Sequence, residues 1–137
     1  MRSLWPGKLI VKGILDPDDA RAAVAAGADA VVVSNHGGRQ LDGAPSSIAA
    51  LPRIADAIGG RCEVWMDGGV RSGQDVFKAL ALGAGATLIG KAFLYGLGAM
   101  GERGVATALE LIRKELDVTM ALTGTCDVQN IGPRALW

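Results

Sequence analysis

One stretch of the sequence decides the fold: Ala30-Val31-Val32-Val33-Ser34-Asn35-His36-Gly37-Gly38-Arg39-Gln40-Leu41-Asp42. Its first four residues are apolar and mostly β-branched, which predicts a strand buried on both faces. The polar residues that follow include the only histidine of the chain and, three positions later, an arginine. Parallel α/β folds keep their chemistry just past the carboxyl ends of strands. The stretch therefore predicts a parallel sheet and the edge of that sheet where a site is expected.

Similar apolar runs recur along the chain and alternate with helical segments. Strands are predicted at residues 9–11, 30–33, 63–66 and 87–89. Helices are predicted to begin at Pro17, Ser47, Ser72 and Glu102, and the last three end near Gly59, Gly83 and Leu116. This alternation with short links predicts parallel βα units. Because a (β/α)8 barrel takes roughly 250 residues, four units predict either an open sheet or half of a barrel.

The composition fits one domain with a real core. The chain has 137 residues, half of them apolar, and 14 basic residues balance 14 acidic ones. A net charge of zero gives no general attraction to nucleic acid, so no nucleic-acid partner is expected. Cys62 and Cys126 lack metal-like spacing and are interpreted as unpaired thiols in a reducing compartment. With no signal peptide or spanning stretch visible, we expect a cytoplasmic protein, and peripheral attachment to the membrane stays open.

Three groups of residues could carry chemistry, and Lys12 is the first. It stands at the end of the first predicted strand, next to Gly13, where its ammonium group could reach a ligand over the sheet. The alternative is a strand-end lysine that extends into water. The residue alone does not decide between these interpretations.

The second group is the polar stretch after residues 30–33. His36 could act as a general base because its ordinary pKa lies near neutrality. Arg39 could hold a carboxylate through two parallel hydrogen bonds, and Ser34 offers a hydroxyl at the strand end. The alternative is a polar loop with a hydrogen-bonded histidine, which the position and crowding of these residues disfavour.

The third group consists of two glycine turns with cations. Asp67-Gly68-Gly69-Val70-Arg71 follows one predicted strand, and Gly90-Lys91 follows the next. Exposed backbone N–H groups, the positive end of the helix after Ser72 and the cations are the parts of a phosphate cradle. The alternative is a pair of ordinary turns with solvated cations. Gly96 to Gly101 fits G-x-G-x-x-G, but no strand precedes it, so dinucleotide binding is not expected there.

Together these residues resemble the carboxyl half of the FMN-dependent α-hydroxy-acid oxidising family, which includes glycolate oxidase, flavocytochrome b2, L-lactate dehydrogenase and mandelate dehydrogenase. The resemblance runs from Leu4 to the end and is most specific at Ser34 to Asp42. Residues 90–96 and 110–116 look most similar to bacterial L-lactate dehydrogenases. The resemblance implies the carboxyl-terminal half of a (β/α)8 barrel, with residues 1–137 as a single piece.

The same resemblance implies an oxidoreductase that converts an L-2-hydroxy acid, such as lactate, to a 2-keto acid with FMN as cofactor. His36 would be the base, and Arg39 would hold the substrate carboxylate. The implied FMN contacts are Lys12 and Ser34 at the flavin ring, Asp67 at the ribityl chain, and Gly69, Arg71, Gly90 and Lys91 at the phosphate. No metal site is expected.

Two departures limit what the chain is expected to do alone. The family usually has arginine where Lys91 stands, and its amino half, with the carboxylate that orients the histidine, is not found here. We therefore expect the chain to be a truncated reading frame or a fragment, and to be inactive alone. The alternatives are a half-barrel that only binds phosphate or FMN, and another phosphate-binding barrel similar to IMP dehydrogenase. Open sheet edges tend to pair, so a homo-oligomer is expected.

Overall fold

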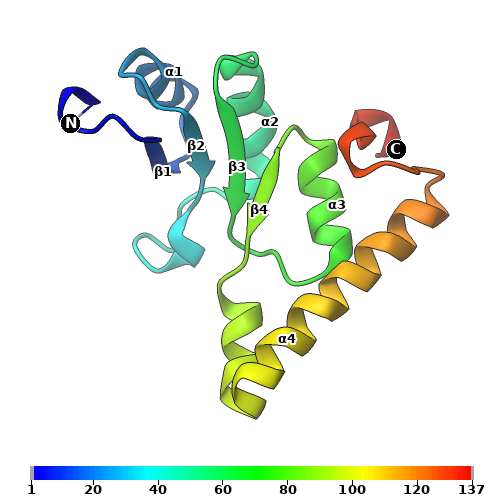
Figure 1. The fold of residues 1–137 in the computed structure, drawn as a ribbon. Coiled ribbons are helices and arrows are strands. Elements are labelled where there is room, and N and C mark those ends of the chain that lie inside the picture. The colour runs from blue at the N-terminus through cyan, green and yellow to red at the C-terminus, as the bar shows by residue number, and fades with distance from the viewer. Residues whose placement is uncertain (1, 137) are drawn as a thin grey trace.

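The computed structural model describes residues 2–136, so Met1 and Trp137 lie outside the described residues. One sheet contains β1 (Ile10–Ile14), β2 (Ala30–Val33), β3 (Glu63–Asp67) and β4 (Ala86–Leu88) in that order, all parallel. The α-helices are α1 (Pro17–Ala25), α2 (Ser47–Ile58), α3 (Gly73–Ala81) and α4 (Lys91–Leu122). Short 3-10 turns are η1 (Arg2–Leu4), η2 (His36–Gly38), η3 (Val128–Asn130) and η4 (Pro133–Ala135). The predicted α/β fold of four parallel βα units is confirmed (Figure 1).

The main hydrophobic core lies between the sheet and α1, α2 and α3. All four residues of β2 are buried, as the apolar run 30–33 predicts. Val31 and Val33 pack with Leu51 and Ile54 of α2, and these four side chains are fully buried. Each such burial contributes about 1.5–3 kcal/mol. The core therefore fixes β2, and with it the segment that begins at Ser34.

The other face and both edges of the sheet are less protected. The register pairs Lys12 with Val32, Val32 with Trp65 and Trp65 with Ala86, so these residues form one row across the sheet. Ile10 of β1 is 44% exposed and Leu88 of β4 is 37% exposed. Within residues 2–136, no further strand pairs with the outer edge of β1 or β4. The sheet therefore has the strand order of a barrel but is not closed into one.

The first three helices follow their sequence signals. The Asp16 side chain accepts from the backbone N–H groups of Asp18 and Asp19 at the start of α1. Ser72 and Asp75 form a complete capping box before α3, and Gly59 ends α2 with a left-handed φ of 57°. These local signals are strong because each satisfies backbone groups that a helix end leaves unpaired.

The final helix differs from its prediction. It begins at Lys91 instead of Glu102 and extends to Leu122, with a break at Met100 and Gly101, where Gly101 has a φ of 60°. The six residues of the G-x-G-x-x-G pattern thus lie inside α4, which confirms that no strand precedes them. The break lets the two parts of α4 fold back on each other, with the backbones of Gly96 and Gly104 in direct contact.

The second part of α4 is only partly covered. Leu109 is 51% exposed, whereas Leu116 packs against the cluster around Phe77 of α3. Gly73, the first residue of α3, lies against the backbone of Ile112 and Leu116. The contact with α3 therefore covers α4 around Ile112 and Leu116, whereas Leu109 is half-exposed.

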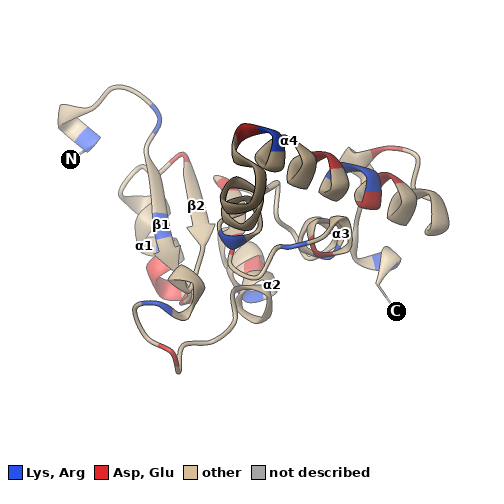
Figure 2. Ribbon diagram, turned by 90° about the horizontal axis from the view of Figure 1, so that it is seen from below, with Lys and Arg blue, Asp and Glu red and all other residues tan. Residues whose placement is uncertain are grey.

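The outward surface of α4 is charged. Figure 2 shows acidic and basic residues following one another along this helix. Arg113 bonds Glu110 and Asp117, at 2.8 Å in each case, one turn away on either side. Such pairs at helical spacing stabilise an exposed helix modestly. None of the helices in residues 2–136 combines the length and the apolar character needed to cross a membrane.

The Gly96–Gly104 contact predicts the effect of adding a methyl group. The Gly104→Ala variant would place its Cβ against the Gly96 carbonyl, so we expect a loss of about 1–3 kcal/mol in the free energy of unfolding, which urea denaturation measures. Gly98→Ala is the matched control, because no atom lies within 4 Å of its Cβ position. The control should be neutral or more stable by up to about 1 kcal/mol. Equal stability of the two variants would contradict the close crossing.

At the amino ends of β1 and β2, Asp29 predicts a pH dependence of stability. Its carboxylate accepts from the backbone N–H of Leu9 and the ammonium of Lys8, and chiefly these contacts lower its pKa from 3.8 to about 2. Because the folded pKa lies below the unfolded one, the stabilisation is fully present above pH 4 and is lost as the pH falls towards 2. In urea titrations at pH 7, 4 and 2.5, the Asp29→Asn variant should be less stable at pH 7 and should lose less stability below pH 4. Parallel losses in both proteins would refute this role.

Candidate functional site

Three strand ends meet at the Lys12 ammonium group. Its Nζ donates to Ser34 Oγ of the β2 end at 2.9 Å and pairs with Asp67 Oδ2 of the β3 end at 2.6 Å. The Asp67 side chain is 19% exposed and that of Lys12 is 42% exposed. Lys12 therefore does not simply extend into water. It places a positive charge at the carboxyl edge of the sheet and draws the three predicted residues together.

The second oxygen of Asp67 has no partner. Asp67 Oδ1 is buried and accepts no hydrogen bond within the described part of the chain. Buried polar atoms almost always have a partner, so this oxygen marks a place where a hydroxyl or N–H group of a ligand fits. The polar edge of the sheet is thus only partly satisfied by the protein itself.

The backbone of His36 adopts an unusual conformation. Its φ of 56° is the only positive value for a non-glycine residue in residues 2–136. The His36 N–H donates to Ser34 Oγ at 3.1 Å, and the next N–H, of Gly37, donates to Asn35 Oδ1 at 3.0 Å. Strained residues of this kind concentrate at functional sites. The strain here is held by side chains of the same segment.

Gly13 makes room for the imidazole. A Cβ atom at Gly13 would lie 2.7 Å from His36 Cε1, so the imidazole packs over the backbone of β1. Gly13 has a φ of 99° and lies where the β1–β2 register shifts, between Lys12 and Ile14. β1 therefore runs further than its predicted end at residue 11 and carries Lys12 within it. The glycine next to Lys12 was the only sequence signal for this approach.

Arg39 follows this segment and is exposed. It is the residue directly after η2, and its guanidinium makes no hydrogen bond or ion pair among residues 2–136. His36 is also exposed. The side chains of His36 and Arg39 are therefore both accessible from the solvent.

The two glycine turns provide open backbone. Neither Gly69, with a φ of 86°, nor Gly90 has any atom within 4 Å of its Cβ position. Gly90 is the residue before α4, and no side chain caps that helix. Lys91 Nζ donates to the carbonyl oxygen of Gly37 at 3.4 Å, which brings the start of α4 next to the His36 segment. An uncapped helix start beside a cation suits an anion.

The start of α3 is bonded by two carboxylates of the chain. The Asp75 carboxylate accepts from the N–H groups of Arg71 and Ser72 at 2.9 and 3.0 Å. Glu115 of α4 accepts from the Gly73 N–H at 2.8 Å. Two carboxylates therefore already accept from the N–H groups at the positive end of α3, and its use by a phosphate stays a prediction. Arg71 itself is exposed.

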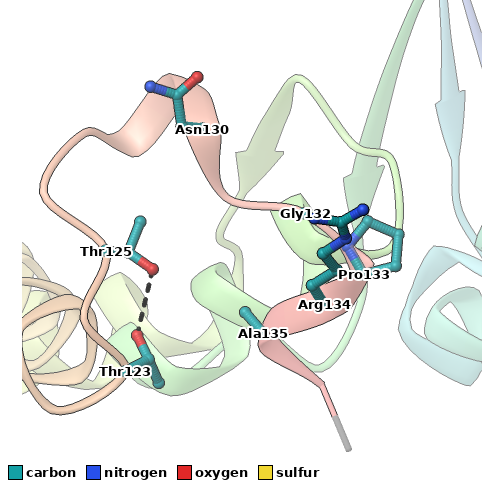
Figure 3. Close-up of a pocket in the computed structure, with 7 residues that line it drawn as sticks. All are labelled: Thr123, Thr125, Asn130, Gly132, Pro133, Arg134 and Ala135. Carbon is teal, nitrogen blue, oxygen red and sulfur yellow. Dashed lines mark hydrogen bonds between the residues drawn. The ribbon is translucent and has the colours of Figure 1, made fainter.

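The larger of the two described cavities lies elsewhere. It has a volume of about 350 Å³ and is lined by residues between Thr123 and Ala135, at the end of α4 and in the tail. Figure 3 shows the Thr123 and Thr125 hydroxyls, 3.3 Å apart, facing each other there. None of its lining residues comes from a strand end. In the part of the chain described, no group of three or more metal-ligating side chains occurs either.

Comparisons with known proteins agree with this geometry. The family model of FMN-dependent dehydrogenases matches residues 1–137. An L-lactate dehydrogenase of Caulobacter vibrioides is 60% identical over 136 residues, which are 99% of this chain and 36% of that protein. An L-lactate dehydrogenase of Xanthomonas axonopodis pv. citri is 56% identical over 99% of this chain and 35% of that protein. The chain thus spans about a third of the length of these relatives, and the predicted likeness to bacterial L-lactate dehydrogenases is confirmed.

Solved structures identify the fold in the same way. A mandelate oxidase variant with a monooxide FMN adduct superimposes with a TM-score of 0.89 at 50% identity, over 93% of this chain and 40% of that one. Mandelate oxidase with (S)-2-phenylpropionate gives a TM-score of 0.90 at 50% identity, over 93% of this chain and 38% of that one. These flavoenzymes are (β/α)8 barrels, so the four βα units form part of such a barrel. The chain belongs to the family of FMN-dependent dehydrogenases.

Proposed function

We propose that this chain supplies the FMN-holding and catalytic part of an enzyme that oxidises an L-2-hydroxy acid to a 2-keto acid. The observation that carries the proposal is the Lys12 ammonium, fixed by Ser34 and Asp67 at the same sheet edge as His36. Membership of the family and the lactate dehydrogenase relatives support the reaction class. A lactate-like acid is the substrate class that these relatives favour.

The residues present fit FMN. The unpartnered Asp67 Oδ1 suits a ribityl hydroxyl, and the open backbone at Gly69 and Gly90 suits a phosphate. Residues proposed to hold the cofactor are Lys12 and Ser34 at the flavin ring, Asp67 at the ribityl chain, and Gly69, Arg71, Gly90 and Lys91 at the phosphate. When bound, FMN would accept the two electrons that the alcohol carbon loses. The charge of Lys12 would stabilise negative charge that develops beside it.

The substrate would be handled by the exposed pair of residues. Oxidation of a 2-hydroxy acid removes two protons and two electrons, and His36 would take one of the protons as general base. Arg39 would bind the substrate carboxylate through its planar guanidinium, which matches that group bidentately. The free guanidinium and the exposed imidazole support these roles.

The second candidate is a chain that binds phosphate or FMN without turnover. Two observations favour it. One face of the sheet is open, and the chain spans only 36% of the length of the Caulobacter vibrioides L-lactate dehydrogenase. We propose that residues 1–137 form a single piece equivalent to the carboxyl-terminal half of the barrel, and that this piece alone is inactive. The second candidate is thus the expected behaviour of the isolated chain.

Assembly and location are proposed on separate grounds. The free edges of β1 and β4, with Ile10 and Leu88 partly exposed, support a homo-oligomer. Cys62 and Cys126 are free thiols, which suits a reducing compartment such as the cytoplasm. Peripheral attachment at the inner face of the membrane stays open.

A chimera tests the proposed reaction. This chain would replace the matching 136 residues of the Caulobacter vibrioides L-lactate dehydrogenase, to which it is 60% identical. We expect the chimera to reduce its flavin with L-lactate, and the His36→Gln variant to lower the single-turnover rate by roughly 10²–10⁴-fold, the usual range for a lost general base. Arg103→Gln, on the exposed side of α4, serves as the control and should keep the rate. Unchanged flavin reduction in the His36→Gln chimera would disprove the assignment.

A further inference from the structure

The strained conformation of His36 needs support from outside its own loop. A left-handed φ in a non-glycine residue persists only where the surroundings enforce it. Ser34 and Asn35 each accept a backbone N–H of the segment, from His36 and Gly37. Ser34 is buried and is already held from β1, because the Lys12 ammonium donates to its Oγ. Asn35 lies one residue further into the loop and needs an anchor of its own on another element.

Ser47 is such an anchor. Its Oγ accepts the backbone N–H of Asn35 at 3.1 Å, across a separation of twelve residues. The Asn35 amide also reaches the carbonyl oxygen of Pro45 at 3.3 Å, just before α2. The backbone and the side chain of Asn35 thus both bond residues at or just before the start of α2. Because the core holds α2 firmly, these bonds fix the loop that carries His36.

Helix capping does not explain the Ser47 hydroxyl. The residue that caps α2 by position is Ser46, which makes no side-chain capping bond. Ser47 is the first residue of α2 and is only 2% exposed, so its hydroxyl is a buried polar group directed at the neighbouring strand end. Buried polar groups are costly unless bonded, and the bond that Ser47 accepts is the one from Asn35.

A third element converges on the same point. A Cβ atom at Gly68 would lie 2.8 Å from Ser47 Oγ and 3.0 Å from Asn35 Oδ1. Gly68 directly follows Asp67, and its φ is 94°. The turn after β3 therefore closes onto the Ser47–Asn35 contact, which couples the position of the His36 loop to the strand end that carries Asp67.

We propose that Ser47 is a positioning residue that holds the His36 loop in its strained conformation. The assignment rests on the proposed function, since it takes His36 as the base, but the contact that it describes belongs to the chain alone. Without the hydroxyl, the Asn35 N–H would lose its acceptor, and the loop would relax towards ordinary backbone angles. The imidazole would then leave its place over Gly13.

The single histidine makes the test direct. In the isotope-labelled 137-residue chain, His36 gives the only imidazole signals, so its ring and backbone shifts report the loop without ambiguity. We expect Ser47→Ala to shift or broaden the His36 signals and to raise the hydrogen-exchange rate of the Asn35 amide roughly tenfold, as for a lost hydrogen bond. Ser47→Thr retains a hydroxyl and should restore both, and Ser46→Ala should change neither.

Amide hydrogen exchange in β2 distinguishes a local change in the His36 loop from a general loss of stability. The amides of Val31 and Val33 should keep their rates in the Ser47→Ala variant. Acceleration of the whole sheet, or unchanged His36 and Asn35 signals, would overturn the proposal. If the alanine variant does not fold, Ser47→Cys keeps the volume with a weaker acceptor and should show the same local loosening. These readouts need neither FMN nor turnover, so a failure of the proposed function leaves them informative.

Discussion

The site depends on one partly buried ion pair, between Lys12 and Asp67. With the added bond to Ser34, it joins the carboxyl ends of β1, β2 and β3. Asp67 is the more buried partner, and its second oxygen has no protein partner in residues 2–136. Removing one member of such a pair leaves the other charge uncompensated. The pair therefore both fixes the geometry of the edge and leaves one acceptor for a ligand.

Near this pair, the starts of α3 and α4 differ in what they bond. The start of α3 is closed by Asp75 and by Glu115, and it serves to dock α3 on α4. The start of α4 carries no side-chain cap and lies beside Lys91. In the proposed function the phosphate would therefore rely on α4 and the open turn at Gly69. The His36 loop lies next to this region, because Lys91 reaches the carbonyl oxygen of Gly37.

Much of the fold was predictable because its signals are local. The β-branched run of β2 and the helix starts near Pro17 and Ser72 depend on signals within a few residues, and each of these predictions was confirmed. The extent of α4 was not predictable, because its fold-back depends on a glycine contact between its two halves. The site residues could be chosen because they follow predicted strands. The hydrogen bonds and the ion pair among their side chains could not be predicted from the sequence. The Ser47–Asn35 contact spans twelve residues and follows no periodic pattern.

The central claim is that the strand-end residues and the start of α4 form an FMN site. Titrating the chain with FMN and with riboflavin, which lacks the phosphate, tests it most directly through flavin fluorescence. We expect saturable binding of FMN at one site, tighter than that of riboflavin by roughly tenfold or more, as for a charge-assisted phosphate contact. Lys91→Ala should remove much of that difference, because it deletes the cation beside the open helix start. Equal affinity for the two flavins, or no saturable binding of FMN, would contradict the claim.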